Sequence, residues 1–151
     1  MIYKSYLIEN NLKNLDKKIY LFFGENHGLK EDIKNKIKIN FNNYEILLFN
    51  QDELMKDKFL LLNETDNLSL FKKNKIFILF DVNDKILDLI KNIEINLDEN
   101  KIFLFADILD KKSKIKSHFE KSPNLVAVAC YEDNEQTIKS IIKEKLKDFN
   151  G

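Results

Sequence analysis

The sequence predicts an open α/β fold in which a mostly parallel five-stranded sheet lies between two layers of helices. The first observation is a set of five short runs rich in apolar residues, each nearly continuous rather than alternating. Such runs are typical of strands buried on both faces of a parallel sheet. The second observation is that segments with helical spacing separate these runs. Strands that alternate with helices form an open sheet covered on both faces.

The five predicted strands are, in chain order, Ile19–Phe23, Tyr44–Phe49, Lys75–Phe80, Lys101–Phe105 and Leu125–Cys130. The predicted helical segments are Tyr3–Leu15, Leu29–Phe41, Asp84–Ile93, Lys112–Lys121 and Glu135–Phe149. Their apolar residues recur mostly every three or four positions, which places them on one face of a helix. In the second segment this stripe consists of Leu29, Ile33, Ile37 and Phe41.

Composition narrows the possible functions. The length of 151 residues favours one domain, and the formal net charge of zero gives no overall attraction to nucleic acid or membranes. The chain contains no arginine, so it has no bidentate guanidinium for phosphate. Cys130 is the only cysteine, which excludes an internal disulfide and favours a reducing compartment. Because no apolar run reaches membrane length and no signal-peptide core is present, we expect a cytoplasmic protein without membrane partners.

A glycine-containing loop follows the first predicted strand, where nucleotide-binding α/β proteins carry G-x-x-x-x-G-K-[ST]. Gly24, Gly28 and Lys30 occur in that order, but the second glycine comes one residue early and is separated from the lysine by one residue. Glu31 replaces the Mg²⁺-binding hydroxyl, and Glu25 places a carboxylate where backbone amides would meet phosphate. We therefore expect a degenerate phosphate loop that turns over no nucleotide, or simply a tight turn.

Metal and nucleophile chemistry find no support in the sequence. His27 and His118 have no second His or Cys at metal-ligand spacing, and Cys130 stands alone. No nucleophile elbow or other local signature accompanies these residues. We expect both histidines to lie at the surface, with no metal or cofactor.

Asp81 and Asp107 end two predicted strands, where open-sheet enzymes place acids. A phospho-acceptor at Asp81 would suit a receiver-like signalling domain. That domain also needs an acidic pair after the first strand, which Glu25 could fill in part, and a lysine after the last strand, which is missing. Capping of a helix N-terminus is the interpretation that we prefer for both aspartates.

Two further clusters have alternative interpretations. Lys111, Lys112, Lys114 and Lys116 form the densest basic cluster, which could contact a phosphate backbone but better fits a solvated helix face. In the segment 66–73, Leu68 and Phe71 share one helical face whereas Leu70 points elsewhere, so at least one large apolar side chain would be left unburied. Core packing is one interpretation of these residues. An exposed Leu-Phe pair would instead anchor a partner's pocket.

Several short motifs follow one another along nearly the whole chain. They are Tyr20-Leu21-Phe22-Phe23-Gly24-Glu25, Ser69-Leu70-Phe71 before the strand at Lys75–Phe80, Leu104-Phe105-Ala106-Asp107 leading to Leu109-Asp110-Lys111-Lys112-Ser113-Lys114, Phe119-Glu120-Lys121-Ser122-Pro123-Asn124, and Ala129-Cys130-Tyr131-Glu132-Asp133. In their order and spacing, these motifs resemble the N-terminal domain of the delta subunit of the bacterial DNA polymerase III clamp loader.

The resemblance implies the fold of AAA+ ATPases without a working nucleotide site, and a subunit without catalytic activity of its own. It implies binding to the sliding clamp (the beta subunit) and help in opening the ring during DNA replication. The implied apolar plug, which enters a pocket on the clamp, consists of Leu68, Ser69, Leu70 and Phe71. The implied partners are the gamma or tau and delta-prime subunits of the loader. Primed DNA would be reached through the assembled complex. The resemblance thus implies a subunit of the DNA-directed DNA polymerase III holoenzyme, which is a nucleotidyltransferase.

The resemblance also implies a division of the chain. Residues 1–140 are expected to form the clamp-binding domain, and residues 141–151 the end of the last helix and the start of a linker to a second domain. Two alternatives stay open at this point: a functioning P-loop NTPase and a receiver-like signalling module.

Overall fold

A six-stranded, fully parallel sheet forms the centre of the molecule in the computed structural model, which describes residues 1–66, 74–94, 97 and 99–131. The strand order is β1-β6-β2-β5-β4-β3. The strands are β1 (Ile2–Lys4), β2 (Ile19–Phe23), β3 (Glu45–Asn50), β4 (Lys75–Val82), β5 (Lys101–Ala106) and β6 (Leu125–Ala129). The predicted open α/β class is confirmed, with one strand more than the five expected.

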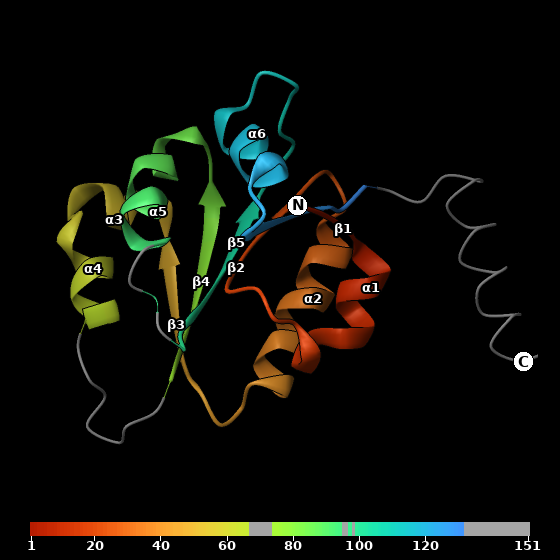
Figure 1. Cartoon of the computed structure of the whole chain (residues 1–151), viewed down its shortest axis with the longest axis horizontal. Helices are drawn as coiled ribbons and strands as arrows, with labels where there is room; N and C mark the ends of the chain where they lie inside the picture. The colour runs from red at the N-terminus through yellow and green to blue at the C-terminus, as the bar shows by residue number, and fades with distance from the viewer. Residues whose placement is uncertain (67–73, 95–96, 98, 132–151) are drawn as a thin grey trace, which may run out of the picture.

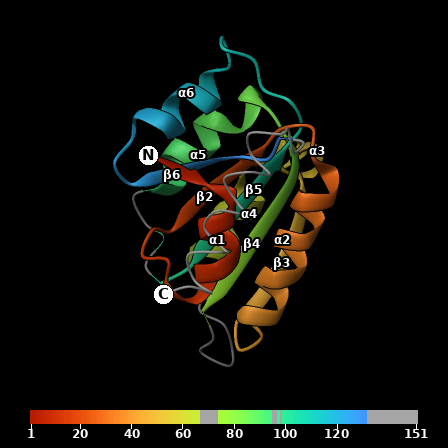
Figure 2. The same ribbon diagram turned by 90° about the vertical axis from the view of Figure 1, so that its right-hand side faces the viewer.

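Helices cover both faces of the sheet (Figure 1). On one face lie α1 (Ser5–Asn11), the 3-10 turn η1 (Leu12–Asn14) and α2 (His27–Asn40); Figure 2 shows α1 and α2 in front of the strands. On the other face lie α3 (Gln51–Lys56), α4 (Phe59–Asp66), the 3-10 turn η2 (Asp84–Ile86), α5 (Leu87–Ile93) and α6 (Lys114–Lys121). None of the described helices is long and apolar enough to cross a bilayer.

Successive residues of each central strand enter opposite cores, which is why the strands read as continuous apolar runs. In β2, Leu21 and Phe23 pack with the α3–α6 layer, whereas Tyr20 and Phe22 pack with the α1–α2 layer. On the face that α1 and α2 cover, stacked aromatic rings join neighbouring strands, and the ring centroids of Phe22 and Phe105 are 4.9 Å apart. Burial on both faces therefore fixes the strands and their register.

The segment predicted as one helix, Tyr3–Leu15, is instead a short strand, a helix and a 3-10 turn. The strand β1 pairs with β6 at the edge of the sheet, in the register Ile2 with Ala127. Two helices that the sequence analysis did not predict, α3 and α4, lie between β3 and β4. The predicted helix Glu135–Phe149 lies outside the described residues.

The strand order does not fit the receiver-like alternative. In receiver domains, with the order 2-1-3-4-5, the first strand lies between the second and the third. Here the first long strand, β2, lies between β6 and β5, the last two strands of the chain. The chain therefore has a different open-sheet topology.

Asp84 joins the turn after β4 to the start of α6. Its Oδ1 accepts hydrogen bonds from the Ser113 hydroxyl (2.8 Å) and the Ile115 N–H (3.0 Å), and its Oδ2 accepts one from the Lys114 N–H (3.1 Å). Burial opposes ionisation, but these donors outweigh it and hold the pKa of Asp84 below its ordinary value. A carboxylate from a neighbouring loop thus satisfies amides at the helix N-terminus.

We expect Asp84→Ala to lower the free energy of unfolding by about 1–2 kcal/mol near neutral pH, because two helix N–H groups and a hydroxyl lose their acceptor. Since the folded pKa is lowered, this stabilisation is present above the unfolded pKa of about 3.9 and is lost as the pH falls through the folded value. Urea unfolding at a series of pH values measures the difference in unfolding free energy between the wild type and Asp84→Ala. Asp84→Asn, which keeps one acceptor oxygen, should lose less. A difference between wild type and Asp84→Ala that stays constant below about pH 4 would contradict this account.

Candidate functional site

The glycine loop lies at the carboxyl end of β2, where open α/β sheets bind ligands. Only residues 24–26 separate Phe23, the end of β2, from His27, the start of α2. Gly24 has a φ of +125°, and a Cβ at this position would lie 2.3 Å from the Cys130 carbonyl oxygen. Gly24 is therefore required by the close approach of Cys130, the residue that follows β6.

The start of α2 is already capped by the protein itself. The Asn26 side-chain oxygen accepts the Leu29 N–H at 3.1 Å, and the Asn26 N–H donates to the Cys130 carbonyl oxygen at 2.9 Å. The Asn26 amide also donates to the Tyr131 carbonyl oxygen at 3.2 Å. Gly28 is the second residue of α2, and a Cβ there would meet only Asn26 Oδ1, at 3.7 Å. Gly28 consequently lies inside a helix rather than in a phosphate-binding loop.

Lys30, the lysine of the predicted degenerate loop, points into the protein. Its side chain is buried, with 8% of the residue exposed, and its ammonium donates to the Ala106 carbonyl oxygen at 2.9 Å. That carbonyl belongs to the last residue of β5. The group that would neutralise a phosphate therefore anchors α2 to the sheet.

A shallow pocket of about 130 Å³ borders this lysine at the carboxyl edge of the sheet. Lys34, one of its lining residues, pairs with Glu31 at 2.9 Å and lies over the rings of Phe80 and Phe105, 5.7 and 5.5 Å from their centroids. The hydrogen bond from Lys34 lowers the pKa of Glu31. Both lysines of the pocket thus have partners within the protein.

The two strand-end aspartates also line this pocket, and the preferred interpretation of both as helix caps is wrong. Asp81 has a left-handed φ of 57°, next to an irregular register between β4 and β5, and its Oδ2 accepts the Asn50 side-chain amide at 3.1 Å. Asp107 Oδ1 accepts the N–H of its own neighbour Ile108 and lies 4.0 Å from His27 Nε2. Asp84, three residues beyond Asp81, is the aspartate that caps a helix.

The histidines and the cysteine offer no metal site or nucleophile. The His27 side chain is exposed, as expected, but His118 is half-buried, with its Nε2 3.7 Å from Glu94. Cys130 is fully buried, and burial raises the pKa of its thiol to about 12, which keeps it protonated. Within the described part of the chain, no group of three or more His, Cys, Asp or Glu residues could hold a metal ion.

The basic cluster is mostly a solvated surface, as the sequence analysis preferred. Lys111, Lys112 and Lys114 are exposed. Lys116 lies over the Phe23 ring, 5.4 Å from its centroid, and its ammonium is 3.9 Å from a Glu120 oxygen. One of the four lysines therefore supports packing.

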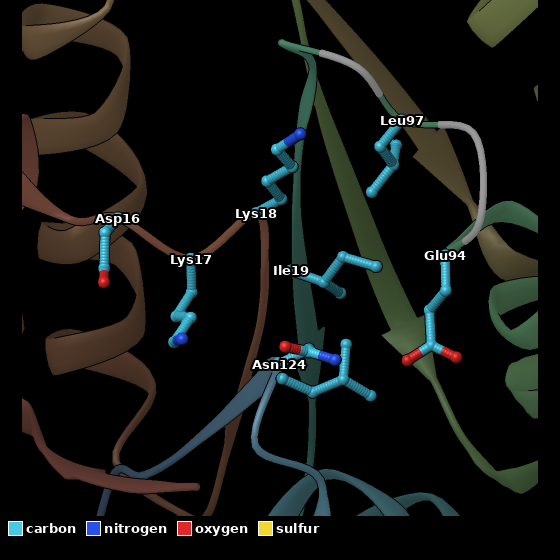
Figure 3. A pocket seen from close by; sticks show the side chains of 8 residues that line it. Asp16, Lys17, Lys18, Ile19, Glu94, Leu97 and Asn124 are labelled. Atoms are coloured by element: carbon cyan, nitrogen blue, oxygen red, sulfur yellow. The ribbon is translucent and has the colours of Figure 1, made fainter.

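A larger hollow of about 290 Å³ opens at the opposite, amino end of the strands (Figure 3). Lys17, Lys18, Asp16, Glu94 and Asn124 line it together with apolar side chains. Charges of both signs are mixed here, and the site lies at the end of the sheet where this fold class does not place ligands. The carboxyl edge is therefore the better candidate by topology, and a second, more open hollow of about 450 Å³ lies there between the segments that follow β4 and β5.

The predicted plug residues Leu68, Ser69, Leu70 and Phe71 lie outside the described residues. The elements on either side are described: α4 ends at Asp66, and β4 begins at Lys75. The buried Lys75 ammonium donates to the Glu64 carbonyl oxygen at 2.9 Å and to Glu64 Oε2 at 3.1 Å. The start of β4 is thereby joined to the last turn of α4. The sequence gives no signal that Lys75, at the start of a strand, would be buried and would contact Glu64.

Gly24→Ala and Gly28→Ala form a matched pair that tests what the loop is for. We expect Gly24→Ala to lower the free energy of unfolding by roughly 2 kcal/mol or more, because its Cβ would collide with the Cys130 carbonyl and its φ is strained for alanine. Gly28→Ala should be neutral or stabilise the protein by about 0.5 kcal/mol, because it replaces a helical glycine. Urea unfolding measures both. Equal effects of the two substitutions would contradict the structural role given to Gly24.

A scan against models of protein families finds no match, and a search of curated proteins finds none. Among solved structures, the chain is similar to RIF2 of Saccharomyces cerevisiae, with 17% identity, 86% of this chain covered and a TM-score of 0.51. The match spans 54% of the RIF2 chain, about half its length. Domain III of the replication initiation protein DnaA from Thermotoga maritima aligns with 16% identity, covering 97% of this chain and 68% of that chain, at a TM-score of 0.49. At this level of identity the comparison shows the fold alone, an open parallel α/β sheet with helices on both faces, which is the fold class expected from the sequence.

Proposed function

We propose that this chain is a non-catalytic clamp-loader subunit that binds the sliding clamp of a replicative DNA polymerase and helps to open the ring. One observation carries the proposal: in an AAA+-like fold, the lysine expected at the phosphate site is buried on the Ala106 carbonyl. An engaged Lys30 favours a role in binding over nucleotide hydrolysis. The motifs that resemble the delta subunit supply the partner.

The loop geometry supports this function over an active P-loop NTPase. A phosphate loop needs free backbone amides and a free ammonium that both point at the ligand. Here the Asn26 side chain accepts one of the first amides of α2, and Lys30 donates to the sheet. Binding a nucleotide would require both contacts to break.

The framework on either side of the proposed plug supports its role as a binding element. Lys75 and Glu64 join the two elements that flank the segment 67–73, so the last turn of α4 is held beside the start of β4. Fixing the ends of a loop lowers the entropy lost when it binds. Burying a leucine and a phenylalanine contributes roughly 3–6 kcal/mol before ordering costs, which corresponds to about two to four decades of affinity.

Ring opening follows from differential affinity. A plug that binds better to a clamp whose neighbouring elements have moved shifts the ring towards its open form, without chemistry in this subunit. In this proposal the gamma or tau and delta-prime subunits are its partners in the cytoplasm, and primed DNA is reached through the assembled complex. Residues 1–140 form the clamp-binding domain, and residues 141–151 lead to a second domain.

The double variant Leu70→Ser, Phe71→Ser tests the plug. We expect the unaltered chain to bind the sliding clamp of its own species with a Kd of about 1 μM or tighter, and the variant to lose at least a hundredfold, because two apolar side chains leave the clamp pocket. Surface plasmon resonance without nucleotide measures this, and circular dichroism checks the fold. Phe59→Ser is the matched control, since Phe59 is 70% exposed at the far end of α4. Unchanged affinity in the folded double variant would refute the proposed plug.

A measurement of nucleotide binding distinguishes the proposed clamp-binding subunit from an active P-loop NTPase. We expect isothermal titration of Mg²⁺-ATP into the chain to give no saturable heat, because Lys30 and the start of α2 are engaged within the protein. Titration of the clamp in the same buffer provides the positive control. Saturable heat with ATP at micromolar to millimolar concentration would favour an active P-loop site instead.

A further inference from the structure

The α-amine of Met1 is enclosed by backbone carbonyl groups. It donates to the carbonyl oxygens of Phe119 (2.6 Å), Glu120 (3.0 Å), Ser122 (2.8 Å) and Leu125 (3.0 Å). Figures 1 and 2 both place the N-terminus beside α6. The first two of these carbonyls belong to the last turn of α6, and the fourth to the first residue of β6.

Two of these carbonyls, those of Phe119 and Glu120, are groups that a helix end leaves without a partner. The last four C=O groups of an α-helix accept no bond within it, and the helix dipole places partial negative charge there. An ammonium offers three donors and a positive charge, and charged donors form the stronger hydrogen bonds. Burial lowers the pKa of the Met1 amine, because its charged form loses water, while Glu120 opposes that shift. The carbonyl oxygens take the place of the lost water.

The same residue sets the register of the edge strand. The Met1 carbonyl oxygen accepts the Ala127 N–H at 2.8 Å, and β1 continues along β6 with Ile2, Tyr3 and Lys4 opposite Ala127, Val128 and Ala129. A strand of three residues has few ladder bonds of its own. Its attachment therefore depends on the amine at one end and on α1 at the other, where Ile8 is fully buried.

We propose that the α-amine of Met1 is a modification-sensitive anchor: β1 docks on β6 when this amine is free, and an acyl group on it releases the edge strand. Formylation or acetylation removes the charge and leaves a single N–H. It also adds heavy atoms where oxygens already lie within 3.0 Å of the nitrogen. A residue placed before Met1 acts in the same way.

The anchor implies a preceding reaction for any chain that is made with an acylated Met1. An amide hydrolase must cleave the acyl C–N bond. Water supplies the oxygen to the acyl carbon and a proton to the nitrogen, so that a carboxylic acid leaves and the amine is freed. Docking of β1 follows that hydrolysis.

Three forms of the protein test the anchor: one with Met1 free, one with formyl-Met1 retained by blocking deformylation during expression, and one with Gly-Ser before Met1. Intact mass verifies each form. We expect both blocked forms to unfold at a midpoint lower by roughly 5 °C and to exchange the Ala127 amide hydrogen at least about tenfold faster. Gly-Ser added after Gly151 is the matched control and should leave both values unchanged. Equal midpoints and equal Ala127 protection in all forms would overturn the proposal.

A second measurement on the unaltered chain covers the case in which the blocked forms do not fold. Amine-reactive labelling near neutral pH favours the α-amine, because the lysines stay protonated. We expect labelling of Met1 to be at least about tenfold slower in the folded chain than in urea, because the carbonyl groups enclose the amine. Equal labelling rates would show that the amine is free, and the anchor would be excluded.

Discussion

The close approach of β2 and β6 at Gly24 constrains the rest of the structure. The Cys130 N–H donates to the Phe23 carbonyl at 2.6 Å, the Asn26 N–H donates to the Cys130 carbonyl at 2.9 Å, and the Gly24 N–H donates to the Asp107 carbonyl at 3.2 Å. These bonds join the end of β2 to the chain that follows both of its neighbours. They leave no length for a phosphate loop, so α2 begins at once. The backbone of the protein itself thus fills the place where nucleotide chemistry would occur.

The chain contains no arginine, and three of its buried or half-buried lysines donate to backbone carbonyl groups near the ends of helices and strands. Lys30 donates to a carbonyl at the end of β5, Lys75 to one in the last turn of α4, and Lys101 to the Leu15 and Lys17 carbonyls before β2. An ammonium is a compact charge with three rotatable donors, so it suits carbonyls that converge from different segments. Seen in this set, Lys30 is a structural lysine like the others, and only its place in the sequence suggests phosphate.

The strands could be predicted from sequence because burial on both faces leaves a local signal, and Ile19–Phe23 matches β2 without change. β1 could not be predicted, because a strand of three residues depends on contacts of Met1 with residues more than a hundred positions away. The expectation of a degenerate phosphate loop rested on Glu31 and the spacing of Gly28. The hydrogen-bond partner of Lys30 could not be predicted from the sequence, because a long flexible side chain can reach many groups and only the fold decides which one is near. The aspartates show the same limit: Asp81 and Asp107 were expected to cap helices, whereas Asp84, about thirty residues away in sequence, accepts the first amides of α6.

Polar contacts between side chains hold the loops at the carboxyl edge in place. The Asn50 amide binds Asp81, and the buried Gln51 exchanges two hydrogen bonds with Asn83. These pairs tie the start of α3 to the turn after β4, and α3 leads to α4 and to the proposed plug. Side-chain amides hold this edge together within the protein. These contacts matter for the proposed role, because a plug on a well-ordered support loses little entropy on binding. More of its binding free energy can then favour the open form of the ring.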